Sequence, residues 1–96
     1  MPYLRYSARA QHDLKRLFDF LKEKDAPVAL KAISEIRASL TLLLRMPETG
    51  RPVEDGLREH IIDFGSSGYI ALYEFDSMLD EVVVYAIKHQ LKDDYQ

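Results

Sequence analysis

Three histidines are the side chains best suited to proton transfer near neutral pH, because the unperturbed imidazole pKa is about 6.5. They are His12, His60 and His89. Their spacing matches no metal-ligand pattern and the chain has no cysteine, so we expect neither a metal nor another cofactor. His89 ends a predicted strand, where it could act as an acid or base or could bond to the backbone. Without a placed partner, the backbone interpretation is favoured.

Two arginines could contact a carboxylate of another protein. Arg51 lies in a predicted loop, where functional residues collect, and simple surface charge is the alternative. Arg58 follows Leu57 at the start of a predicted strand, so the two should face opposite sides. If Leu57 faces the helices, Arg58 faces the open side of the sheet. There it would be a contact residue or a solvated cross-strand partner of Glu74.

The elements that must position these residues follow from the hydrophobic period. A short strand is predicted over residues 2–6, and Ser7 is the predicted N-cap of a helix that ends near Lys24. Pro27 suits the first position of a second helix, which Pro47 and Gly50 stop. Apolar residues recur at helical spacing in both segments. They are Leu14, Leu17, Phe18 and Leu21 in the first, and Ala29, Ala32, Ile33, Ile36, Leu40, Leu43 and Leu44 in the second.

Beyond residue 50 the pattern is that of strands, predicted over 57–64, 69–75 and 81–89 with turns between them. The apolar run 82–87 indicates a strand buried on both faces, hence in a central position. We predict one α+β domain over residues 1–96, of order β-α-α-β-β-β. A helical hairpin should pack on one face of a small, mainly antiparallel sheet, with the first strand paired to the last.

Charge is uneven along the chain. The net charge is −3, yet residues 61–96 contain 2 Lys and 7 Asp/Glu, a net of −5. Nucleic-acid binders usually present a basic surface, which this composition lacks. No cysteine, signal peptide or apolar run of membrane-spanning length is present, so we expect a cytoplasmic protein.

Five stretches, in their order and spacing, resemble the RelE/ParE toxin superfamily, and in particular its ParE-like branch. They are Ala10–Leu14, Pro47–Pro52, Leu57–Glu59, Gly68–Tyr73 and Val84–Gln90. The resemblance implies the toxin of a type II toxin–antitoxin pair, neutralised by a cognate antitoxin that is ParD-like or another small protein. ParE-like members act on DNA gyrase and RelE-like members cut messenger RNA on the ribosome. Both activities share one fold, so the fold cannot choose between them.

RNA cleavage without a metal needs groups that move protons and stabilise the phosphorane charge. The resemblance to RelE-like enzymes points to Arg51, Arg58, Tyr73, His89 and Tyr95. This set is thin, because the last third has few cations. We therefore expect a ParE-like gyrase inhibitor that acts by protein contact and has no catalytic residue, with Arg51, Arg58 and His89 as candidates for target contact. The alternatives are a RelE-like ribosome-dependent mRNA endoribonuclease and an inactive member that only binds its antitoxin.

Four other residues are candidates for antitoxin binding. Phe20 lies about 100° from the apolar stripe of its helix, and Leu42 lies nearly opposite the stripe of the second helix. Two such residues on one hairpin favour a binding groove, although isolated exposed apolar residues are common. Tyr69 and Tyr73 share one strand face that could stack bases, pack in the sheet or dock the antitoxin. With few cations nearby, packing or protein contact is favoured.

Overall fold

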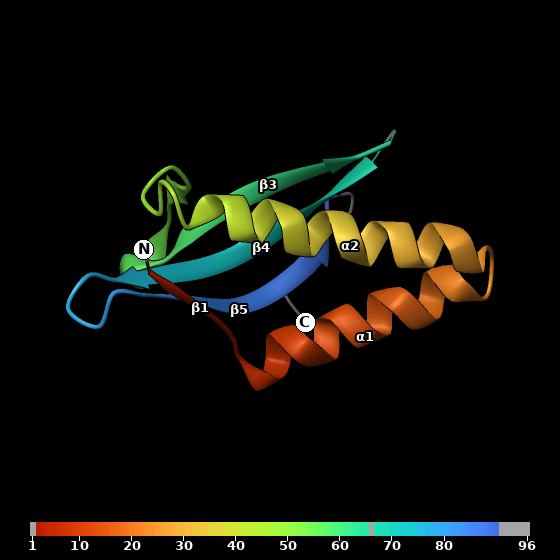
Figure 1. Cartoon of the computed structure of the whole chain (residues 1–96), viewed down its shortest axis with the longest axis horizontal. Helices are drawn as coiled ribbons and strands as arrows, with labels where there is room; N and C mark the ends of the chain where they lie inside the picture. The colour runs from red at the N-terminus through yellow and green to blue at the C-terminus, as the bar shows by residue number, and fades with distance from the viewer. Residues whose placement is uncertain (1, 66, 91–96) are drawn as a thin grey trace.

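The computed structural model describes residues 2–65 and 67–90. Figure 1 shows two helices that form a hairpin along one side of a twisted sheet. The predicted fold class is confirmed, and the structure adds a two-residue strand. The elements are β1 (Tyr3–Tyr6), α1 (Ala8–Lys22), α2 (Ala26–Leu43), β2 (Arg51–Pro52), the 3-10 turn η1 (Glu54–Gly56), β3 (Arg58–Phe64), β4 (Ser67–Asp76) and β5 (Glu81–His89).

The sheet has the strand order β1-β5-β4-β3-β2. β1 pairs with β5 in parallel, and the other pairs are antiparallel. The predicted pairing of the first and last strands is therefore confirmed, as is the internal position of β5. β2 was not predicted, because two residues are too few to show an alternating pattern.

Polar side chains fix the start of each helix. Ser7 Oγ accepts the Ala10 N–H at 3.0 Å, as predicted for an N-cap, and donates to the Tyr85 carbonyl at 2.9 Å. Asp25 caps α2 by accepting the Val28 N–H at 3.3 Å. Asp25 supplies the N-cap, so the second helix begins at Ala26, one residue before Pro27.

The core lies between the helical hairpin and one face of the sheet. Tyr69, Ala71 and Tyr73 share that face and are buried, which confirms the predicted alternation in β4. Tyr85 is the extra residue of a β-bulge, since Leu72 pairs with Ala86 and Tyr73 with Val84. Tyr85 is also the one exposed residue in the run 82–87. The other five residues of that run are buried, as predicted. The remaining buried core residues are Ala10, Leu14, Ile36, Leu40, Leu43, Ile62, Val82, Val84 and Ile87.

Candidate functional site

A loop after α2 is held against the sheet by a buried tyrosine. The Tyr73 hydroxyl donates to the Pro47 carbonyl at 2.6 Å and accepts the Gly50 N–H at 2.9 Å. A Cβ on Gly50 would lie 2.5 Å from that hydroxyl and 2.8 Å from the Glu59 carbonyl, so only glycine fits. Burial raises the pKa of Tyr73, opposed by the Gly50 N–H, so the hydroxyl stays protonated. We call residues 47–50 the clamped loop.

Arg58 completes the clamp, and its predicted orientation was wrong. It pairs directly with Tyr73, whose side chain is 0% exposed, so Arg58 lies on the helix-facing side of the sheet. The prediction counted strand alternation from Leu57, but Leu57 follows η1 and precedes the strand. Arg58 donates to the carbonyls of Glu48 and Gly50, both at 2.9 Å, and therefore cannot be the cross-strand partner of Glu74.

Arg51 lies on the open face of the sheet, in β2 rather than in a loop. Its guanidinium forms an ion pair with Glu59, directly opposite in β3. On the same face Arg5 pairs with Glu81 at 3.2 Å, and the Tyr85 hydroxyl donates to Glu74 at 3.0 Å. The centre of this face is apolar, with Ile61, Ile70, Leu72 and Val83. Among the residues that the structure describes, carboxylates thus accompany the arginines of this face, and no basic patch is formed there.

Two predicted groups of residues meet in one pocket beside α1. Phe20, proposed for antitoxin contact, lies across the pocket from Tyr69 and from His89, proposed for target contact. The His89 ring meets the Tyr69 ring edge-on at 5.4 Å between centroids. Phe20 is 55% exposed, whereas Tyr69 is 2% exposed and contributes mainly to packing. This pocket of about 340 Å³, which we call the α1 pocket, is lined by Arg16, Leu17, Phe20, Leu21, Phe64, Tyr69 and His89.

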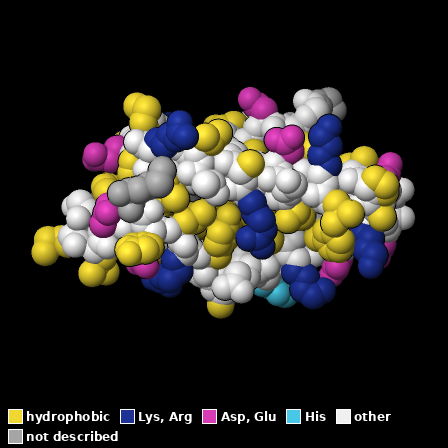
Figure 2. Space-filling view, in the orientation of Figure 1, with side chains coloured by type: hydrophobic (Ala, Val, Ile, Leu, Met, Phe, Trp, Pro, Cys, Tyr) yellow, Lys and Arg dark blue, Asp and Glu magenta, His cyan; other side chains and the backbone are white. Residues whose placement is uncertain are grey.

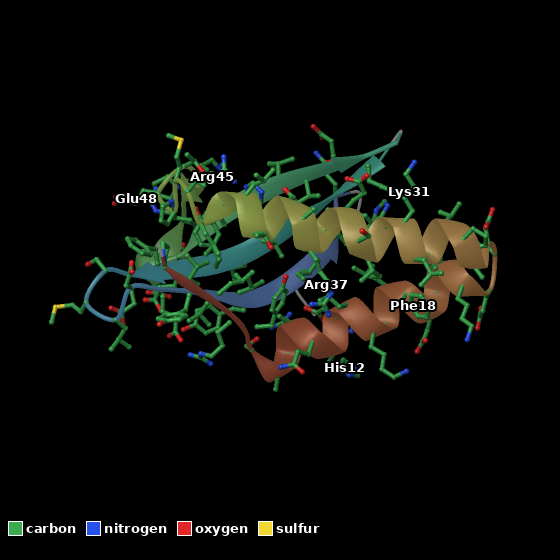
Figure 3. The ribbon with its side chains drawn as sticks, viewed as in Figure 1. His12, Phe18, Lys31, Arg37, Arg45 and Glu48 are labelled. Carbon is green, nitrogen blue, oxygen red and sulfur yellow. The ribbon has the colours of Figure 1, made fainter. Side chains whose placement is uncertain are left out.

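The clamped loop and the α1 pocket lie apart. Tyr73 belongs to the clamp and Tyr69 to the pocket, four residues along β4, or about 14 Å at about 3.4 Å per residue. Figure 3 shows Glu48 of the clamped loop at one end of the helical hairpin, whereas Phe18 of α1, a helix that lines the α1 pocket, lies toward the other end. Arg58 and His89 are therefore not brought together. Tyr95 lies outside the described residues.

The remaining antitoxin candidates differ in accessibility. Leu42 is 62% exposed on α2 and does not line the α1 pocket. Tyr73 is 0% exposed, so its side chain offers no surface to a protein partner. For the same reason, a nucleic-acid base cannot stack on its ring. For Tyr73 the structure favours the packing interpretation.

Sequence reasoning missed the hydrogen bonds of two polar residues, of which Asp13 is buried in the core and His60 is half-buried. Asp13 is buried, accepts the Ile87 N–H at 2.9 Å and pairs with Arg16 at 3.0 Å, which ties α1 to β5. Its position three residues after Ala10, on the apolar face of the helix, was an available signal. His60 Nε2 lies 2.9 Å from Ser39 Oγ, and burial lowers the pKa of His60 below its ordinary value.

Neither a metal site nor a membrane-spanning helix is found in the part of the chain that the structure describes. No three His, Asp or Glu side chains there are grouped to hold a metal ion. No helix there is long and apolar enough to cross a bilayer.

Known proteins similar to this chain fall in one superfamily. The family model described as the ParE toxin of the type II toxin–antitoxin system parDE matches residues 4–94. Toxin RelE1 of Caulobacter vibrioides is 37% identical over 67 residues, covering 70% of this chain and 72% of the relative. Toxin RelE3 of the same organism is 31% identical over 84 residues, covering 88% and 89%. The superfamily resemblance is thereby confirmed.

Two solved structures share the fold. The chromosomal ParDE system of P. aeruginosa superposes with a TM-score of 0.75 at 24% identity, covering 93% of this chain and 96% of that one. The intact E. coli RelBE toxin–antitoxin complex superposes with a TM-score of 0.64 at 17% identity, covering 96% and 100%. At such identities the likeness concerns the fold.

Proposed function

The chain belongs to the ParE toxin family of type II toxin–antitoxin systems, and from that premise we propose that it inhibits DNA gyrase by protein contact and is neutralised by a cognate antitoxin. The observation that carries this proposal is the dispersal of its candidate catalytic groups. Arg58 is used to hold the clamped loop, and His89 lies at the α1 pocket, away from it. A protein-directed inhibitor needs no such cluster, because a few well-packed side chains carry most of the binding energy at protein interfaces.

A nuclease of this fold would need cations gathered around the scissile phosphate. Arg51 points to the open face and is paired with Glu59, whereas Arg58 points to the helical face. The two arginines lie on opposite faces of the sheet, which counts against their acting together on one phosphate.

Charge on the surface also supports protein contact. Figure 2 shows Lys and Arg side chains spread singly over the helical face rather than gathered in one patch. The arginines of the open face are accompanied by Glu59 and Glu81. Phosphate binding by such surfaces would be weak, because affinity for nucleic acid comes largely from neutralising phosphates.

The second candidate function is a RelE-like mRNA endoribonuclease. It is favoured by the names of the two relatives, which are both RelE toxins. In that case Arg51, Arg58 and His89, with Tyr95, would return as catalytic candidates.

Two reactions with purified toxin separate the candidates. One is supercoiling of relaxed plasmid by gyrase and ATP, scored for lost supercoiling or trapped double-strand breaks. The other uses translating ribosomes, with primer extension to detect codon-aligned cuts in the message. We expect inhibited supercoiling and an intact message. Message cuts with supercoiling untouched would replace the proposal with the nuclease.

Variants with matched controls test the proposed target contacts. Arg51→Gln should weaken gyrase inhibition, whereas Arg5→Gln should leave it nearly unchanged, although both remove an ion-paired arginine from the open face. Equal effects of the two would count against a specific role for Arg51.

A further inference from the structure

The turn between β4 and β5 presents two large apolar side chains to solvent. Met78 is 92% exposed and Leu79 is 67% exposed. They are neighbours in a short connection, residues 77–80, because Asp76 at the end of β4 pairs with Glu81 at the start of β5. Figure 1 shows this turn projecting at one end of the molecule, and Figure 2 shows hydrophobic side chains protruding at that end. Turns usually contain small or polar residues, so two large apolar side chains here indicate a contact surface. We call residues 77–80 the hairpin tip.

Hydrogen bonds hold the hairpin tip from both of its ends. Asp76 Oδ1 accepts the N–H groups of Met78 and Leu79, at 3.0 Å and 3.1 Å. Asp80 adopts a φ of 52°, and its carbonyl accepts the Tyr3 N–H of β1 at 2.8 Å. A turn that is fixed in this way loses little conformational entropy when its side chains bind a partner. The two apolar side chains are therefore presented by a preorganised backbone.

The surroundings of the hairpin tip are acidic. Asp76 and Asp80 flank Met78 and Leu79, and the sequence has no Lys or Arg in residues 59–87. Among the described residues, the ion pairs include neither Asp76 nor Asp80. Carboxylates at such a surface repel phosphates and attract cations. The hairpin tip is therefore complementary to a basic protein surface that contains an apolar recess.

The α1 pocket, where Phe20 is a candidate for antitoxin contact, lies at the other end of the β4–β5 hairpin. Tyr69 and His89 of the pocket pair with each other there, whereas Asp76 and Glu81 pair beside the hairpin tip. Tyr69 and Asp76 are seven residues apart along β4, or about 24 Å at about 3.4 Å per residue. A target at the hairpin tip would therefore meet a different surface from a partner at the α1 pocket.

We propose that the hairpin tip inserts Met78 and Leu79 into an apolar recess of gyrase that is bordered by Lys or Arg side chains. This inference deepens the proposed function and rests on it for the identity of the partner. An enzyme that holds DNA must neutralise phosphates and therefore presents basic surface, to which the carboxylates of Asp76 and Asp80 are complementary. Two adjacent apolar side chains match the few well-packed anchors that dominate binding at protein interfaces.

Replacing the two apolar side chains tests their insertion. The tip variant is Met78→Gln with Leu79→Gln. Its matched control is Met46→Gln with Leu30→Gln, which changes the same residue types where they are 65% and 64% exposed. Substitutions at such exposed positions change stability little, and the thermal midpoint of each variant reports its fold. Calorimetry measures affinity for purified gyrase, and the supercoiling reaction measures inhibition. We expect the tip variant to bind at least about tenfold more weakly and the control to bind within about twofold of the parent.

Oxidation of the parent toxin provides a second measurement, which decides the matter if the tip variant does not fold. Peroxide converts an accessible methionine to its sulfoxide, which mass spectrometry detects. Met78 and Met46 are both largely exposed in the free toxin. We expect bound gyrase to slow the oxidation of Met78 and to leave that of Met46 unchanged.

The contribution of charge is tested by a variant that keeps the turn intact. Asp76→Asn retains a side-chain oxygen that can accept the two N–H groups, and Asp80→Asn places a residue that tolerates positive φ. The control, Glu23→Gln with Glu35→Gln, removes the same charge from exposed positions on the helical hairpin. We expect the Asp76→Asn/Asp80→Asn variant to bind gyrase about threefold more weakly than its control at low salt. This difference should shrink at high salt, because exposed charges are screened.

Several results would overturn the proposal while gyrase inhibition by the parent stands. They are parental affinity in a folded tip variant, equal losses in the tip variant and its control, and unchanged oxidation of Met78 in the complex. Loss of antitoxin affinity, or loss of a toxin dimer in sedimentation, with gyrase binding unchanged would assign the hairpin tip to that other partner. A parent that binds gyrase through the tip but inhibits nothing would refute the proposed function and leave this inference standing. A parent that does not bind gyrase would refute both.

Discussion

Removing a single oxygen atom from the core, by Tyr73→Phe, should loosen the clamped loop and lower the stability of the domain. The hydroxyl makes two hydrogen bonds, to the Pro47 carbonyl and from the Gly50 N–H. The Gly50 N–H is buried, and leaving such a group unpaired costs about 1–3 kcal/mol, whereas an ordinary hydrogen bond contributes about 0.5–1.5 kcal/mol net. Pro47 is only partly buried, so water can reach its carbonyl. Together these terms give a loss of about 2–3 kcal/mol.

For a domain of this size, 1 kcal/mol lowers the thermal midpoint by about 4–8 °C, so Tyr73→Phe should lower it by about 10–20 °C. Tyr85→Phe is the control, because that hydroxyl bonds to Glu74 at the surface and should cost less than about 0.5 kcal/mol. Calorimetric melts of both variants at one pH provide the comparison. Equal midpoints for the two would refute a stabilising role for the clamp.

Three further predictions concern the core, pH and the antitoxin. Ile36→Ala or Leu40→Ala should each cost about 2–5 kcal/mol, and unchanged thermal midpoints would contradict their place in the core. Burial lowers the pKa of His60, so its stabilising contribution is present above about pH 6.5 and is lost as the pH falls below that value. The thermal midpoint of His60→Gln should therefore depend less on pH than that of the parent between about pH 7 and pH 5. Phe20→Glu and Leu42→Glu should weaken antitoxin binding more than they destabilise the toxin; calorimetric affinities equal to the parent's would exclude this surface.

The order of the elements could be predicted because each has a strong local signal. Helical spacing, the Ser7 cap and the apolar run 82–87 each specify one element without reference to the others. Pairing of the first and last strands then followed, because a hairpin of two helices returns the chain to its starting side.

The candidate site could be predicted only in part, because its geometry depends on register. The orientation of Arg58 was wrong since nothing local shows that the strand begins after Leu57. The clamp joins Tyr73 to Gly50, 23 residues apart in the chain, which no local pattern encodes. The α1 pocket likewise joins Phe20 to His89 across the whole domain. The sequence shows which residue types are present, but it does not show which of them lie in contact in the folded chain.

The parallel pairing of β1 with β5 has a consequence for how the chain folds during synthesis. The helical hairpin contains only local contacts and can form early, but β1 has no partner until residues 81–89 exist. Long-range pairings of this kind form slowly, because a long loop must close before any contact stabilises it. β5 also supplies the partner of β4 and the backbone N–H that Asp13 accepts. While the protein is being made, the complete sheet therefore cannot form until β5 has been synthesised.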